Sequence, residues 1–322
     1  HERLVGSEMC IRDSLQNMQA LQTIKKISAE NLPPILVLSG DDIGQFEWMK
    51  EQLLKKVGYD SSDLNYSYFD MKETAYSEVE LDLVSLPFFA DEKIVILDHF
   101  VDVTTAKKRY LTDDELQSFE GYLSAPLETT RLIVFAEGKL DSKRRIVKLL
   151  KRDAQLLEAT ELKEQELRAH FTEEIKSLGL AIDSQAFDQL LIKSGFDFSE
   201  IQKNLEFLKN YKGSSSITIS DIEEAIPKTL QDNLFDLIQM ILKKQIDPAR
   251  SLVKDLRLQG EDEIKLLAIL LSQFRIYTQV KLLKQEGRTE SQIVSDLSEL
   301  TGRKVNPYQV KFALRDLSLI HI

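Results

Sequence analysis

The sequence predicts a doubly wound α/β domain followed by two helical regions, and three observations support this fold class. Five short apolar runs alternate with helical patterns over residues 24–159, as in a parallel sheet wrapped by helices. A glycine-containing turn follows the first run and leads into a helix, which is the arrangement of α/β nucleotide-binding domains. From Thr160 onward the apolar residues recur only at helical spacing.

The expected strands are residues 35–38, 66–69, 94–97, 132–135 and 155–157. All five runs are short enough to be buried strands. Between the first two, residues 45–57 predict a helix whose apolar side chains fall on one side. The acidic residues 113–115 predict the first turn of another helix, because the helix dipole favours carboxylates there.

Size and composition narrow the class of protein. At 322 residues the chain is long enough for two or three domains, each with its own core. A formal net charge of -11 argues against a surface that binds nucleic acid throughout, although it allows a local basic patch. The single cysteine, Cys10, excludes an internal disulfide framework and a cysteine-based zinc site, which fits a reducing cytoplasm. No apolar run approaches the roughly 20 residues of a membrane span, so we expect no membrane insertion.

The amino end carries neither the apolar core of a signal peptide nor an amphipathic period. We expect residues 1–23 to be a non-native or disordered tail without a function of its own. The expected domains are then residues 24–159, 160–229 and 230–322.

The turn after the first strand has the position of a P-loop without its chemistry. A P-loop needs Gly-x-x-x-x-Gly-Lys-Ser/Thr, since backbone N–H groups and the lysine neutralise phosphate and the hydroxyl holds Mg²⁺. Here the two glycines are one residue too close, the lysine and hydroxyl are missing, and two carboxylates repel an anion. This degenerate P-loop consists of Gly40, Asp41, Asp42, Gly44 and Gln45.

Other catalytic positions of P-loop ATPases are also altered. The third strand ends in Asp98, where such enzymes hold Mg²⁺, but His99 replaces the glutamate that activates water in many of them. The fourth strand is followed by Ala-Glu-Gly at residues 136–138, without a side chain that senses a γ-phosphate. We therefore expect no catalytic residue, no cofactor and no metal; His99 is more often structural in such a place than a general base.

The region 160–229 is expected to be a small helical domain. Ser199 with Gln202, and Ser220 with Glu223, have the spacing of capping boxes that begin helices.

The region 230–322 is also expected to be helical. Asp247-Pro248 and Asn306-Pro307 each place a capping residue before a proline at the first helical position. Residues 263–285 predict a long helix that is apolar on more than one side, which suits either a bundle core or a contact between subunits.

An apolar loop, Ser-Leu-Pro-Phe-Phe-Ala-Asp-Glu-Lys at residues 85–93, precedes the third strand. Pro87 disfavours regular structure, and the three charges at its end suggest that the segment emerges into solvent. Phe88 and Phe89 then either anchor in a partner's apolar pocket or fold back onto the sheet.

Taken in order, these segments resemble the delta subunits of the bacterial DNA polymerase III clamp loader, in a form similar to those of streptococci. The resemblance extends from about residue 24 to residue 315, and it depends on the order and spacing of four segments. They are Ser-Gly-Asp-Asp at 39–42, Leu-Pro-Phe-Phe-Ala-Asp-Glu-Lys at 86–93, Lys-Leu-Asp-Ser-Lys-Arg-Arg at 139–145 and Asn-Pro-Tyr-Gln-Val at 306–310.

The resemblance implies an AAA+-like domain, a helical lid at 160–229 and a helical collar at 230–322 that joins the other loader subunits. It implies a cytoplasmic component of the polymerase holoenzyme that hydrolyses no ATP. Its implied partners are the sliding clamp, whose ring it opens for loading during replication, and primer–template DNA. The implied clamp-binding residues are Leu86, Pro87, Phe88 and Phe89, and candidate DNA contacts are Lys143, Arg144 and Arg145, for which a solvated helix face is the favoured alternative.

Two other classes of protein compete with this interpretation. A divergent AAA+ ATPase would use Asp98 with an arginine from a neighbouring subunit, but the missing lysine counts against it. A nucleic-acid-binding regulator of the same fold is disfavoured by the acidic charge. Neither alternative explains the apolar loop.

Overall fold

The computed structural model describes residues 19–88, 90–212, 216–227, 230–301, 305 and 307–316. Two compact units are present, of which the first ends at Ala225 and the second begins at Ile226.

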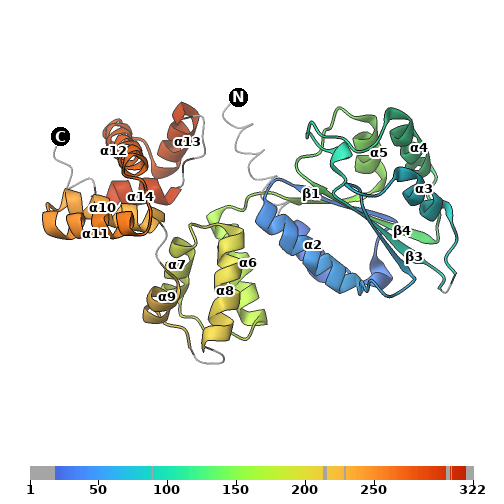
Figure 1. Ribbon diagram of the computed structural model, residues 1–322, viewed down its shortest axis with the longest axis horizontal. Coiled ribbons are helices and arrows are strands. Elements are labelled where there is room, and N and C mark those ends of the chain that lie inside the picture. Colours follow the sequence, from blue (N-terminus) through green and yellow to red (C-terminus); the bar gives the residue numbers. More distant parts are fainter. Residues whose placement is uncertain are drawn as a thin grey trace. The chain divides into compact units, whose positions relative to one another are not determined.

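The first unit is built on a five-stranded parallel sheet in the order β2-β3-β4-β1-β5 (Figure 1). The strands are β1 (Ile35–Gly40), β2 (Tyr66–Asp70), β3 (Lys93–Asp98), β4 (Thr130–Glu137) and β5 (Gln155–Ala159). Every residue of β1 and β3 is buried, as expected of parallel strands covered on both faces. All five predicted strands are confirmed, and each is longer than predicted.

Helices cover both faces of this sheet (Figure 1). They are α2 (Ile43–Val57), α3 (Tyr76–Val84), α4 (Asp113–Ser124) and α5 (Arg145–Asp153). Ile35 and Val37 of β1 belong to the core formed with α3, α4 and α5. Because side chains alternate along a strand, Leu36 and Leu38 point to the opposite face, where α2 packs. The predicted helix face of α2 is confirmed, since Phe46, Met49, Leu53 and Val57 are all buried.

The start of the fold differs from the sequence prediction. Residues 19–26 form a helix in which Leu21 and Ile24 are buried, so the expectation of a tail is wrong for residues 19–23. The apolar pattern there is too short to stand out from the sequence. Residues 1–18 lie outside the described residues.

Four helices complete the first unit. They are α6 (Glu164–Ser177), α7 (Ser184–Lys193), α8 (Phe198–Lys212) and α9 (Ile219–Ala225). Both predicted capping boxes are wrong. Asp197 caps α8, since its carboxylate accepts from the Glu200 backbone N at 2.9 Å, and Thr218 pairs with Asp221 at the start of α9. Each helix begins before the predicted cap, which places Ser199 and Ser220 inside the helix, where they cannot act as N-caps.

The second unit is entirely helical in its described residues. Its helices are α10 (Leu230–Leu242), α11 (Ile246–Leu258), α12 (Glu263–Gln285), α13 (Glu290–Thr301) and α14 (Pro307–Asp316). One core joins α12 to α13 and α14, and another joins it to α10 and α11. The predicted bounds of α12 and the predicted first residue of α14 are confirmed, whereas Asn306 lies outside the described residues.

Two details of this unit differ from the predictions. Helix α11 begins at Ile246, ahead of the predicted cap Asp247, because a proline is tolerated throughout the first turn, where backbone N–H groups have no partner within the helix. By length and composition alone, α12 would be long and apolar enough to cross a membrane. The central helix of a bundle meets the same criterion, and α12 packs against α10, α13 and α14.

Candidate functional site

The carboxyl ends of the parallel strands form the sheet edge where a P-loop protein binds nucleotide. There, the carboxylate of Asp42 accepts a hydrogen bond from the Gln45 backbone N at 2.9 Å. The Gln45 N–H, which is the kind of donor that binds phosphate in a P-loop, is therefore already bonded within the protein. Burial raises the pKa of Asp42; the Gln45 hydrogen bond opposes this, and the carboxylates of Asp197, Glu161 and Asp41 raise the pKa further. The turn is therefore acidic and repels a phosphate.

The two glycines of this turn serve packing. Gly40 has φ +145°, and a Cβ there would lie 1.9 Å from the carbonyl oxygen of Ala159. A Cβ on Gly44 would lie 2.8 Å from the Cβ of Ser199 and 2.9 Å from its backbone N. The first turns of α2 and α8 are thus in contact beside the degenerate P-loop.

Asp98 at the end of β3 is surrounded by protein donors. The Lys50 Nζ lies 2.7 Å from its Oδ2, the Tyr68 hydroxyl donates to the same oxygen, and the His99 backbone N donates to its Oδ1 at 2.9 Å. Burial alone would raise the pKa of Asp98, but the hydrogen bonds from Lys50 and Tyr68 outweigh it and hold the pKa low. The Lys50 ammonium therefore supplies the positive charge beside this carboxylate.

The other positions at which this chain departs from P-loop ATPases make contacts within the protein. His99 has φ +54°, and its Nδ1 lies 3.0 Å from a carboxylate oxygen of Asp70. The Gly40 backbone N donates to the Gly138 carbonyl at 3.0 Å, and the Gly138 N donates back at 2.6 Å, which joins the ends of β1 and β4. Among the described residues, no group of three or more His, Cys, Asp or Glu side chains is arranged to hold a metal ion.

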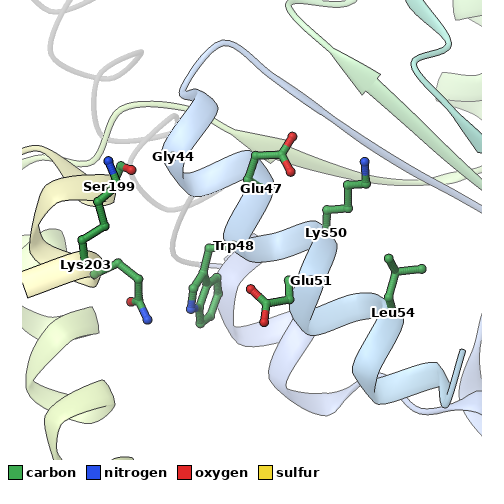
Figure 2. A pocket seen from close by; sticks show the side chains of 9 residues that line it. Gly44, Glu47, Trp48, Lys50, Glu51, Leu54, Ser199 and Lys203 are labelled. Carbon is green, nitrogen blue, oxygen red and sulfur yellow. The ribbon is translucent and has the colours of Figure 1, made fainter. Parts of the chain in front are cut away.

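A hollow of about 420 Å³ lies between α2 and α8, next to this edge. Figure 2 shows the side chains that line it. The carboxylates of Glu47 and Glu51 share its wall with Lys50 and Lys203, and Lys50 is already paired with Asp98. The mixed charge lacks the excess of cations and backbone N–H groups that binds a polyphosphate. The hollow is lined by Gly44, Glu47, Trp48, Lys50, Glu51, Leu54, Ser199, Gln202 and Lys203.

The apolar loop lies at the opposite edge, because it leads into the amino end of β3. Leu86 is 65% exposed and Phe88 is 89% exposed, so Phe88 does not fold back onto the sheet. Phe89 lies outside the described residues. Leu81 and Val84, on the last two turns of α3, are 70% and 58% exposed and extend the apolar surface of the loop. Sequence reasoning missed them because single exposed apolar residues are common on helices.

One charge of the loop does not point into solvent as predicted. Lys93 is only 6% exposed, because its ammonium group bonds back to the end of α3. Asp91 and Glu92 are exposed, as predicted.

The candidate DNA contacts divide into two kinds. Lys143 is exposed, and Arg145 is exposed although its guanidinium pairs with Glu120 at 3.2 Å. Arg144 is bound within the protein, since it donates to the Asp102 carbonyl and pairs with Asp141 at 3.3 Å. The contact with DNA stays a prediction. Of the three candidate residues, Arg144 has a structural role.

Comparisons with known proteins match both units. The sequence model described as "DNA polymerase III, delta subunit" matches residues 36–160, and the one described as "DNA polymerase III delta subunit, C-terminal domain" matches residues 231–320. The DNA polymerase III subunit delta of Bacillus subtilis is 28% identical over 260 residues, covering 80% of this chain and 73% of that protein. The solved structure of the Bacillus subtilis DNA clamp loader delta protein aligns with a TM-score of 0.59 at 26% identity, over 94% of this chain and 88% of that one.

The fold and the site define a non-catalytic α/β protein: a parallel sheet whose carboxyl edge lacks the phosphate-binding groups of a P-loop, joined to a helical unit. Both family models and the alignment with the solved delta structure over most of the chain narrow this class to one family. The chain belongs to the family of DNA polymerase III delta subunits.

Proposed function

We propose that this chain binds the sliding clamp through the apolar loop, with Leu86, Pro87, Phe88 and Phe89 as the binding residues. Delta subunits are components of the clamp loader without catalysis of their own, and binding the clamp and opening its ring is the role of this family. The observation that carries the proposal is the exposure of Phe88, 89%, on a loop at the edge remote from the nucleotide position.

Burial of the exposed loop residues provides binding energy. Transfer of a Phe or Leu side chain from water into an apolar pocket contributes about 1.5–3 kcal/mol. Leu86 and Phe88 together would then supply several kcal/mol, and interfaces are commonly dominated by a few such anchors.

Binding alone does not open a ring. A ligand shifts an equilibrium only by its difference in affinity for the two states. We therefore expect the loop to bind the clamp more tightly when the adjoining ring interface is open, and ATP bound to other loader subunits to control when the loop reaches the clamp.

The direct test is the affinity of this chain for a purified sliding clamp from a related bacterium, measured by surface plasmon resonance. Phe88→Ala should weaken binding by about tenfold to a hundredfold, because it forfeits most of the buried ring. Ile43→Ala is the matched control: its side chain is 60% exposed but lies at the opposite edge of the sheet. Equal affinity of Phe88→Ala and Ile43→Ala would contradict the assignment of the loop.

The proposal extends to the rest of the loader. Helices α6 to α9 would form an AAA+-type lid, and the second unit a collar that joins the other subunits, in a complex that acts on primer–template DNA in the cytoplasm.

The DNA contact has its own test. Replacement of Lys143 and Arg145 by Gln should lower the affinity of the assembled loader for primed DNA. The salt dependence of binding should also decrease, because fewer counterions are released from the DNA when fewer phosphates are contacted. Arg144 is kept, since its bonds to Asp102 and Asp141 support the fold. An unchanged salt dependence would leave these residues as a solvated helix face.

A further inference from the structure

We propose that Lys93 is a positioning residue for clamp binding: its buried ammonium group fixes the start of the apolar loop and thereby pre-organises Phe88. This inference rests on the proposed function and adds a residue that does not itself touch the clamp.

Lys93 joins two parts of the first unit. Its backbone belongs to β3 and donates to the Thr129 carbonyl at 2.9 Å. Its Nζ donates to the backbone carbonyl of Asp82, to the Asp82 carboxylate at 3.2 Å and to the Ser85 hydroxyl at 2.7 Å. An ammonium group has three protons, so each proton has an acceptor on the segment that ends α3.

That segment sets the direction in which the loop leaves the helix. The Asp82 carbonyl also accepts from the Ser85 backbone N at 3.1 Å and from its hydroxyl at 3.0 Å. Leu86 follows directly, and Phe88 is two residues further on. A shift of this carbonyl would therefore move both exposed side chains.

The identity of the residue supports a polar role. A lysine is rarely buried, because removing its charge from water is costly, and an apolar residue would fill the same space at lower cost. Lys93 is 6% exposed, and its hydrogen bonds offset the cost of burying its charge. These hydrogen bonds end on Asp82, in the last turn of α3, and on Ser85, the first residue of the loop.

The far end of the loop is held as well. The Arg131 guanidinium of β4 bonds to both carboxylate oxygens of Glu92, at 2.9 Å and 2.5 Å. Loop ends held in this way reduce the conformational freedom that is lost on binding, which raises affinity without any new contact.

Lys93→Met tests this role, because methionine keeps an unbranched stem and removes the ammonium group. We expect its affinity for the sliding clamp to fall by about tenfold, and Phe88→Ala to cost less in the Lys93→Met background than in the unmodified chain, because an unfixed ring contributes less. Chymotrypsin should also cut at Phe88 several-fold faster in Lys93→Met, which reports on the loop without any clamp.

Two controls separate positioning from general stability. Lys72→Met makes the same substitution at an exposed lysine outside the loop, and Leu190→Ala lowers stability through the buried core of α7. Both should retain the unmodified affinity and cleavage rate at temperatures well below their melting points.

The outcomes are distinct. Additive losses for Lys93→Met and Phe88→Ala, unchanged cleavage, or equal loss of affinity in Leu190→Ala would each overturn the role of Lys93. An unmodified chain that binds no clamp would overturn the proposed function and, with it, a role of Lys93 in clamp binding. If Lys93→Met were nevertheless cleaved faster, Lys93 would still position the loop, and only the identity of the partner would be wrong.

Discussion

At the end of β3, the carboxylate of Asp98 is paired with a lysine. Lys50 and Asp98 are an ion pair with 14% and 5% of their side chains exposed, and Tyr68 donates a second hydrogen bond to the same carboxylate oxygen. A buried carboxylate without such partners would be costly. The residue that is catalytic in P-loop ATPases thus has a structural role in this chain.

The first prediction concerns this pair. Lys50→Met should reduce the free energy of unfolding by about 3–5 kcal/mol, because it leaves a buried carboxylate without its counter-charge. The double variant Lys50→Met, Asp98→Leu should recover part of the loss, since no charge then remains unpaired. Urea unfolding at pH 7 measures both; a single variant as stable as the unmodified chain would show that the pair contributes little.

The second prediction concerns His170, a buried histidine that contacts Trp48 at 4.8 Å between ring centroids. Burial and, to a lesser extent, the positive charge of Lys25 lower its pKa to about 4, although the carboxylate of Glu173 opposes them. Above pH 6.5 the imidazole is neutral in both states. Below that pH the unfolded chain binds a proton that the folded chain does not, so stability decreases until the pH reaches about 4.

The loss from this histidine between pH 7.5 and pH 5 should be about 2 kcal/mol. His170→Phe keeps an aromatic ring and removes the titration, so its urea midpoint should change less over the same interval. An identical pH dependence in both proteins would assign the acid sensitivity to other groups.

At the scale of elements, the contact between α2 and α8 decides what the degenerate P-loop can hold. Gly44 lets the first turn of α2 approach Ser199, and Trp48 packs edge-on against Phe198 at the start of α8. The second glycine of the degenerate P-loop therefore allows a close contact between α2 and α8.

The third prediction compares two glycines in helices. Gly44→Ala should destabilise the protein by about 1–3 kcal/mol, because its methyl group would overlap Ser199 and push the helices apart. Gly121→Ala in α4 should instead stabilise it by about 0.5–1 kcal/mol, since no described atom lies within 4 Å of the new methyl group. The two shifts are compared by thermal unfolding, and equal shifts would mean that α8 yields at little cost.

At the scale of the whole molecule, the two units divide the proposed work. The loop proposed to bind the clamp belongs to the first unit, and a helix with an exposed apolar stripe belongs to the second. Ile264, Leu267 and Leu271 of α12 are 78%, 59% and 53% exposed and recur at the spacing of one helix face. Such a stripe suits a contact with other subunits.

The fourth prediction separates the two tasks. The double variant Leu267→Glu, Leu271→Glu should prevent assembly with the other loader subunits, because burying two carboxylates in an apolar interface is costly. Its affinity for the clamp should remain unchanged. Size-exclusion chromatography of the mixed subunits measures assembly, and retention of the complex would remove this face of α12 from the interface.

Elements with local signals could be predicted from the amino-acid sequence. Buried parallel strands are continuous apolar runs, and α12 lies between clear start and stop signals, so all five strands and the bounds of α12 were predictable. The missing lysine and hydroxyl of the P-loop, and the polar breaks around the loop at residues 85–93, were equally visible. The clamp as partner was inferred from the resemblance, because no local pattern specifies a partner.

The contacts that stabilise these elements became visible only in the folded protein. Lys50 meets Asp98 across 48 positions of sequence, and Lys93 meets Asp82 across 11, so no spacing rule within a helix or strand indicates either pair. Asp197 displaced Ser199 as a cap because neighbouring candidates of similar strength compete, and packing selects where the helix begins. The positions of the strands and helices follow from local apolar patterns. The roles of individual side chains depend on contacts that form only when the sheet and helices pack together.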